Sequence, residues 1–332
     1  MSVLKQLTLL LALLVLSMSI QSSGQTAATP VPAAPLPLAP PDLQLAQKGD
    51  SEAELRVGEW YNSGISGRVD SQQAALWFKR ASDRGSANAR AMLGSLYLYG
   101  HGFTTDRSAA LKLIQSAADQ GSLKGKVFLA QMYMRGWAVK EDHAKAHQLL
   151  AAVGDKEPLA LTLRGIMELQ GEEKHPGVAV ELFKNAAGRG ESGAMLSLGE
   201  MYLFGAGVTQ DFDQAAAWFK QAVRFDNRAA EFRLGQMYAK GVSVPKNLSQ
   251  AYALYKRSAE QGYVPAETLC GTFNYYGAGI AKDKVRAYYW FAKASAYSDI
   301  AKSWLSRVSG ELTPEQRKTA AAMAENATVA TN

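Results

Sequence analysis

The sequence has only one cysteine, Cys270, and therefore cannot form an internal disulfide bond. After its first residues it also has no hydrophobic run long enough to cross a bilayer, so we expect no membrane span. Its Lys and Arg residues are scattered among Asp and Glu, without the basic runs that are typical of nucleic-acid-binding proteins. A chain of 332 residues with these features must be stabilised by side-chain packing, and nucleic acid is not expected among its partners.

The one long apolar stretch lies at the N-terminus. Lys5 precedes the ten residues "LTLLLALLVL" (Leu7–Leu16), a length that suits the hydrophobic region of a signal peptide and is too short to span a bilayer. The sequence therefore predicts a cleaved signal peptide at residues 1–23 and a mature protein in the periplasm, with secretion from the cell as the second choice. No cysteine directly follows the stretch, which excludes the usual bacterial lipid anchor.

A proline-rich segment comes next. Residues 24–41 hold six of the eleven prolines and no charged residue. Such segments favour extended polyproline conformations and act as semi-rigid spacers. We therefore predict that residues 24–42 are a linker.

From residue 43 onward, one pattern of residues recurs seven times. It consists of a glycine followed by a tyrosine at three, a glycine at six, Asp or Asn at twelve, Ala at sixteen and Trp or Leu at nineteen. Successive copies start 34 to 36 residues apart, at Gly58, Gly94, Ala130, Gly165, Gly199, Gly235 and Gly271. The fourth copy is weaker, because it lacks the tyrosine and the loop Asp. A constant period of this kind is typical of a repeat array.

Each copy predicts two short helices joined by a loop. The second glycine, such as Gly205, can adopt the positive φ that ends a helix. Asp211 suits the N-cap of the second helix, and Gln214 would complete a capping box. Because the glycines follow a helix and not a strand, Gly205 and Gly207 are not expected to form a phosphate-binding loop. A helix pair this short cannot bury its apolar face alone, so the pairs must stack on one another.

The pattern "LG..Y..G.G...D...A..W...A" of Leu198–Ala222 resembles the Sel-one-like repeat (SLR), a relative of the tetratricopeptide repeat. The resemblance implies an all-α fold, a right-handed α-solenoid of about seven helix–turn–helix repeats over residues 43–298. Residues 299–326 would form a C-terminal pair of capping helices, and residues 327–332 a disordered tail. The resemblance also implies a protein without enzymatic activity or cofactor, whose first helices line a concave surface.

The candidate binding residues lie one and five residues after the first glycine, where the helical period turns side chains away from the packing face. The row at position five contains Tyr99, Arg135, Phe204, Lys240 and Tyr276, and Glu200, Gln236 and Tyr275 are expected on the same surface. Aromatic residues and cations are the usual composition of binding hot spots. In the alternative interpretation, the three aromatic residues of the row pack against neighbouring repeats.

We identify no catalytic or metal-binding residues in the sequence. His143 and His147 lie four apart on a predicted helix, beside Glu141 and Asp142, but two histidines on an exposed helix are typical of a solvated polar face. Cys270 takes the position of a leucine in other copies and is predicted to be a small core residue.

The leading functional hypothesis is a binding protein that recognises one protein partner in the periplasm. It would act as an adaptor, or as an inhibitor or immunity protein for a secreted antibacterial effector, for example a phospholipase. An envelope-assembly or signalling scaffold is the alternative within this class. A hydrolase, which would need a deep polar pocket with shifted ionisable groups, and a glycan-binding protein are the alternatives from other classes.

Overall fold

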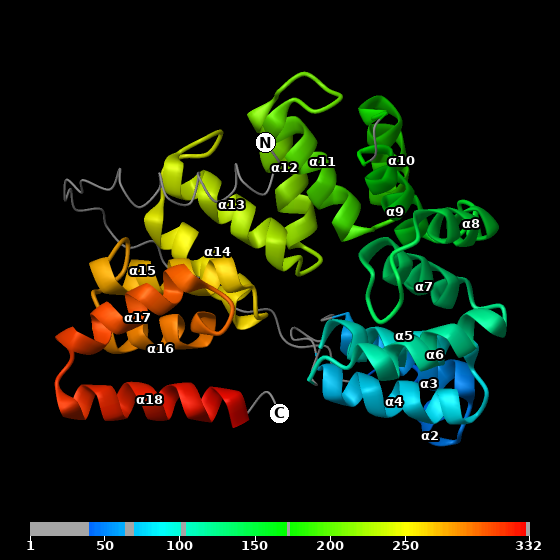
Figure 1. Cartoon of the computed structure of the whole chain (residues 1–332), viewed down its shortest axis with the longest axis horizontal. Helices are drawn as coiled ribbons and strands as arrows, with labels where there is room; N and C mark the ends of the chain where they lie inside the picture. Colours follow the sequence, from blue (N-terminus) through cyan, green and yellow to red (C-terminus); the bar gives the residue numbers. More distant parts are fainter. Residues whose placement is uncertain (1–39, 64–69, 101–103, 171–172, 330–332) are drawn as a thin grey trace. The chain divides into compact units, whose positions relative to one another are not determined.

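The computed structural model describes residues 40–63, 70–100, 104–170 and 173–329. Within these ranges the chain forms seventeen α-helices and no strand. Figure 1 shows the helices following one another in pairs, from blue at the start of the chain to red at its end. The predicted signal peptide, and the predicted linker up to residue 39, lie outside the described residues.

A short helix, α2 (Leu43–Gln47), precedes seven helix pairs. The first helices of the pairs are α3 (Ser51–Asn62), α5 (Ala87–Tyr99), α7 (Leu123–Arg135), α9 (Pro158–Glu168), α11 (Ser192–Phe204), α13 (Arg228–Lys240) and α15 (Val264–Tyr276). The second helices are α4 (Ser71–Asp83), α6 (Arg107–Asp119), α8 (His143–Val153), α10 (Pro176–Gly188), α12 (Phe212–Val223), α14 (Leu248–Glu260) and α16 (Lys284–Ser295). Two further helices, α17 (Asp299–Glu311) and α18 (Pro314–Val329), end the array. The predicted all-α solenoid of helix pairs is confirmed, and α18 continues past its predicted end at residue 326.

The second glycine of the repeat ends the first helix, as predicted. Five of these residues take φ angles between 63° and 76°, namely Gly100, Gly136, Gly205, Gly241 and Gly277. This left-handed conformation is open to glycine without a steric cost. The N–H group of each one donates to the carbonyl group four residues earlier, which satisfies an acceptor at the helix end.

Asp or Asn caps most of the second helices, but the predicted capping box is only half formed. The Asp211 carboxylate accepts a hydrogen bond from the N–H group of Gln214 at 2.9 Å. The Asp211 N–H group, however, donates to the carbonyl oxygen of Tyr202 at 2.9 Å, so it is no longer available to the side chain of Gln214. A complete capping box is present at Thr313 and Gln316, where both hydrogen bonds form.

The first glycine of the repeat makes room for a large side chain of the second helix. A Cβ atom on Gly199 would lie only 2.4 Å from Cε1 of Phe219, whose side chain is fully buried. The same pairing recurs as Gly58–Phe78, Gly94–Ile114, Gly165–Phe183, Gly235–Tyr255 and Gly271–Phe291. In the third pair Ala130 replaces the glycine and Leu150 replaces the ring. In each pair, the size of the residue at the first-glycine position is therefore matched to the size of the buried side chain that it faces.

Loops connect successive pairs along one edge of the array. Gly207 has a φ of 75°, and a Cβ atom there would lie 2.7 Å from the backbone of Pro176 in the preceding pair. Gly279 approaches the backbone of Leu248 in the same way, at 2.5 Å. The hydroxyl group of Ser249 also donates to the carbonyl oxygen of Gly279. The loops of the fifth and seventh pairs therefore pack on the start of the second helix in the pair before them.

Candidate functional site

Most residues of the predicted row lie exposed at the ends of the first helices. Arg135 and Lys240 are exposed, and the exposed fractions of Phe204 and Tyr276 are 56% and 42%. Phe204 and Tyr276 occupy the same helical position in the fifth and seventh pairs. The Tyr276 ring also lies edge-on to Tyr275 and to Trp304, with centroids 4.9 Å and 6.0 Å apart, yet it stays partly exposed. Large aromatic side chains are normally buried, so exposed ring area at two equivalent positions is a candidate contact for a partner.

Tyr99 differs from these residues because it is half-buried between two pairs. Its hydroxyl group donates to the side chain of Gln131, and its ring lies edge-on to Trp137 with 6.2 Å between the centroids. Burial raises the pKa of the Tyr99 hydroxyl well above its usual value. For Tyr99 the alternative interpretation of the aromatic row therefore holds, in which the ring packs against the neighbouring repeat.

Tyr275 is buried, with an exposed fraction of 7%, which corrects the expectation that it shares the surface of Tyr276. It lies four residues after the first glycine, and that position turns its ring toward Trp304 of α17, with centroids 5.2 Å apart. Its hydroxyl group donates to Glu311 at 2.7 Å. Hydrogen bonds from Lys284 and Tyr275 lower the pKa of Glu311 to about 2.

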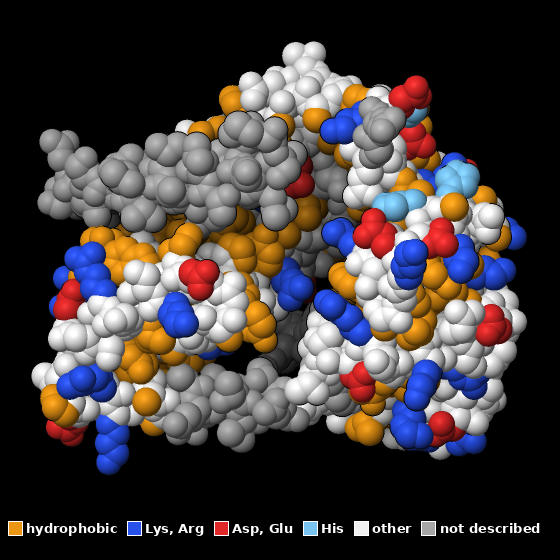
Figure 2. All heavy atoms as spheres, viewed as in Figure 1, with side chains coloured by type: hydrophobic (Ala, Val, Ile, Leu, Met, Phe, Trp, Pro, Cys, Tyr) orange, Lys and Arg blue, Asp and Glu red, His pale blue; other side chains and the backbone are white. Residues whose placement is uncertain are grey.

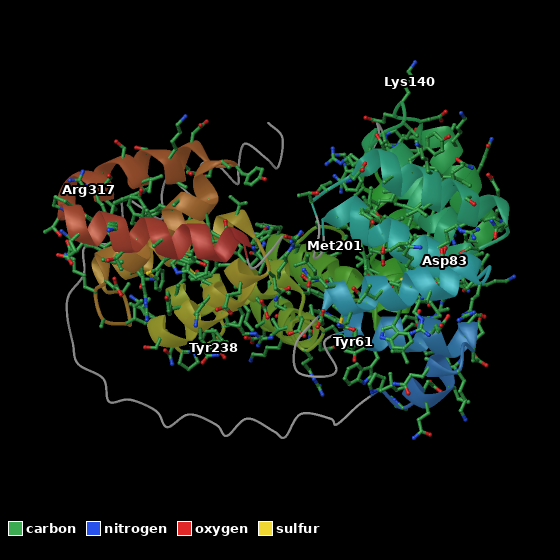
Figure 3. The ribbon with its side chains drawn as sticks, turned by 90° about the horizontal axis from the view of Figure 1, so that it is seen from below. Tyr61, Asp83, Lys140, Met201, Tyr238 and Arg317 are labelled. Carbon is green, nitrogen blue, oxygen red and sulfur yellow. The ribbon has the colours of Figure 1, made fainter. Side chains whose placement is uncertain are left out.

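Glu200 and Gln236 are half-buried and are joined by Arg233, which the sequence analysis missed. Arg233 donates to Glu200 at 2.7 Å and to Gln236 at 3.4 Å, and so links α11 to α13. Only 13% of the Arg233 side chain is exposed. The sequence spacing could have indicated Arg233, because it lies three residues before Gln236 and therefore on the same face of the helix. Figure 3 labels Met201, the core residue next to Glu200 on α11, and Tyr238 on α13.

Three buried acids occupy one repeat position, four residues before the first glycine. Each is paired with cations of the following helix, as Glu54 with Arg80 and Arg84, Glu231 with Arg257, and Glu267 with Lys293. Burial raises the pKa of Glu231 to about 7; the charge of Arg257 opposes this rise, and the nearby Asp226 carboxylate adds to it. The Glu231 side chain has no exposed area and so cannot meet a substrate. These acids therefore form ion pairs inside single helix pairs and are not part of a ligand site.

The remaining polar candidates do not come together into a site. His143 Nε2 lies 2.9 Å from a carboxylate oxygen of Glu141. Within the described ranges, no group of three or more His, Cys, Asp or Glu side chains is placed to hold a metal ion. Cys270 is fully buried, as predicted, and burial raises the pKa of its thiol. Among the described helices, none combines the length and the apolar character that a membrane crossing needs.

The helix pairs correspond to a known repeat family. The Sel1 repeat matches residues 51–86, 87–122, 125–152, 192–224, 228–263 and 264–296, together more than half of the chain. The chain belongs to the Sel1 repeat family. The matched segments leave out residues 153–191, which contain the degenerate fourth copy. Among curated proteins, none matches this sequence closely.

A solved structure of similar fold supports this assignment. A Sel1 repeat protein from Oxalobacter formigenes is 26% identical, with 88% of this chain and 86% of that chain covered and a TM-score of 0.52. An immunity protein from Pseudomonas aeruginosa is 19% identical, with 66% and 84% covered and a TM-score of 0.49. A protective antigen of uropathogenic Escherichia coli is 21% identical, with 86% and 85% covered and a TM-score of 0.36. Of these three, the Oxalobacter protein is the one whose superposition supports the same fold.

Proposed function

We propose that this Sel1 repeat protein binds a protein partner through the loop-side ends of its first helices. The observation that carries the proposal is the exposure of Phe204 and Tyr276 at equivalent ends of α11 and α15. A rigid aromatic ring loses little conformational entropy on binding and buries a large apolar area, which is why such rings act as hot spots. Lys240 lies at the same position of α13, between the two rings in the repeat order.

A finer assignment extends this proposal. The signal-peptide pattern of residues 1–23 supports a location in the periplasm. In that compartment the protein would act without enzymatic activity, as an adaptor or as an inhibitor of a secreted antibacterial effector. In the adaptor role the partner is an envelope or signalling component, and in the inhibitor role it is the effector enzyme itself.

Affinity capture tests the proposal. The purified protein serves as bait in an envelope extract, beside a variant with Phe204→Ala and Tyr276→Ala. The matched control carries Phe225→Ala and Tyr297→Ala, which remove two rings that are 53% and 81% exposed in the connections after second helices. We expect one stoichiometric protein to be held by the native chain and the control, and its recovery to fall roughly tenfold or more in the first variant.

Two results would overturn the proposal. Equal recovery by the two variants would place the binding site elsewhere on the chain. Failure of the native bait to hold any stoichiometric protein would remove the protein partner itself, and glycan-binding and hydrolase assays would then follow.

A further inference from the structure

Three lysines lie beside the proposed aromatic anchors and have no acidic partner among the described residues. They are Lys240 at the end of α13, Lys246 in the loop after it, and Lys282 in the loop after α15, and we call them the basic loop edge. All three are exposed. The ammonium group of Lys282 lies 5.7 Å from the ring centroid of Tyr275, a cation–π contact that leaves its charge uncompensated.

Local geometry places each loop lysine next to the end of its first helix. A Cβ atom added to Gly241, the residue after Lys240, would lie 3.1 Å from Cβ of Lys246. In the seventh pair, a Cβ atom added to Gly277, the residue after Tyr276, would likewise lie 3.1 Å from Cβ of Lys282. The lysines therefore lie at the same end of the first helices as the exposed rings.

Hydrogen bonds tie the loops of the sixth and seventh pairs to the start of the second helix in the pair before each of them. The hydroxyl group of Ser243, in the loop of the sixth pair, donates to Asp213 at the start of α12. Ser249, at the start of α14, donates to the carbonyl oxygen of Gly279 in the loop of the seventh pair. An extended segment rises about 3.3 Å per residue, so a partner segment of ordinary strand length can follow these loops from one pair to the next. Figure 2 shows hydrophobic side chains in the region that Figure 1 labels α14 and α15, with Lys and Arg side chains among them.

The acids at this edge already have internal partners. Asp211 and Asp283 accept hydrogen bonds from the N–H groups that begin α12 and α16. Asp213 accepts from Ser243, and Glu311 is held by Lys284 at 2.8 Å. Asp211 and Asp213 keep their negative charge, because their hydrogen-bond donors are neutral, but the three lysines of the basic loop edge outnumber these two acids, so the net charge that this edge presents to a partner is positive.

We propose that the partner presents an acidic segment to this edge. Its carboxylates lie against the basic loop edge, and its apolar side chains cover Phe204 and Tyr276. This inference rests on the proposed function, since the same two rings are the anchors, and it adds the chemistry of the partner surface. Exposed charge pairs contribute mainly to association rate and specificity, so binding by this edge weakens as salt concentration rises.

The test uses two labelled synthetic peptides, one rich in Glu and Leu and one in which Lys replaces every Glu. Fluorescence anisotropy measures the Kd of each peptide for the native protein and for two charge-reversal variants. The first variant carries Lys240→Glu, Lys246→Glu and Lys282→Glu, and the control carries Lys112→Glu, Lys220→Glu and Lys302→Glu. The control lysines are exposed, have no ion pair with a described residue and lie on α6, α12 and α17, so both variants change the net charge equally.

The acidic peptide is expected to bind the native protein and the control alike, and the first variant roughly tenfold or more weakly. Equal binding to both charge-reversal variants, no binding to the native protein, or equal binding of the basic peptide would overturn the inference. If affinity capture depends on Phe204 and Tyr276 but the acidic peptide does not bind, the proposed function stands and only the inference of an acidic partner segment fails. Peptide binding without any captured protein would instead support the edge and count against the proposed function.

Discussion

The fit between Gly199 and Phe219 leads to a quantitative prediction about the array. In Gly199→Ala, the new methyl group would lie 2.4 Å from a ring carbon of Phe219, closer than side-chain atoms approach in proteins. Overpacking of a buried contact costs about 1–3 kcal/mol, and the higher helix propensity of alanine returns up to about 1 kcal/mol. We expect Gly199→Ala to lower the free energy of unfolding by about 1–2 kcal/mol.

A second substitution should remove the clash that the new methyl group creates. The third pair already combines Ala130 with Leu150 at the equivalent positions, so Phe219→Leu provides the room that the new methyl group needs. Alone, Phe219→Leu should cost about 1 kcal/mol, because it removes part of a buried side chain. The double variant should be about as stable as Phe219→Leu, which corresponds to a coupling of about 1 kcal/mol or more.

Urea unfolding followed by circular dichroism measures this cycle, with the midpoint compared among variants because repeat arrays can depart from two-state behaviour. Gly177→Ala is the control, because a Cβ atom at this position in α10 would meet nothing within 4 Å. It should leave the midpoint unchanged or raise it. Additive effects of Gly199→Ala and Phe219→Leu would refute the matched-pair explanation of the repeat.

Three further predictions follow from single residues. Tyr255→Phe should raise the free energy of unfolding by about 1 kcal/mol, because the Tyr255 hydroxyl is buried without a hydrogen-bond partner among the described residues. An unchanged or lower urea midpoint would contradict this prediction. Ala138→Gly should raise the thermal midpoint and increase the free energy of unfolding by about 1 kcal/mol, because Ala138 has a strained φ of 56° at the repeat position that Gly207 occupies in the fifth pair. A lower midpoint would show that this strain is absent. The pKa of Glu231 is raised from 4.5 to about 7 on folding. The native state therefore binds more protons than the unfolded state between these pH values, so the free energy of unfolding falls as pH rises through them. Glu231→Gln should reduce the slope of the free energy of unfolding against pH, measured by urea unfolding at several pH values. An identical slope in the variant would contradict the assignment of this pH dependence to Glu231.

The fold was predictable because the repeat encodes it through local rules. The positive φ of Gly205 and the cap at Asp211 depend on residues within one helix pair, so the spacing alone indicates them. The second hydrogen bond of the predicted capping box, from the Asp211 N–H group to the Gln214 side chain, does not form, and residue spacing alone could not indicate this. The Asp211 N–H group donates instead to the carbonyl oxygen of Tyr202, in the first helix of the same pair.

The binding surface was less predictable, because exposure depends on residues from other pairs. Tyr99 and Phe204 occupy the same repeat position, yet Tyr99 meets Gln131 of the next pair while Phe204 stays 56% exposed. Tyr275 is covered by Trp304, which belongs to α17 and lies outside the repeat pattern. Arg233 was missed because its role depends on Glu200 in the preceding pair.

The central claim is that a protein partner covers the exposed rings of α11 and α15. Photo-crosslinking in living cells tests it most directly, with benzoylphenylalanine placed in turn at Phe204, Tyr276, Phe225 and Tyr297. A crosslinked product of one mass is expected from positions 204 and 276, and none from positions 225 and 297. Products from the latter two positions alone, or the same products from all four, would contradict it.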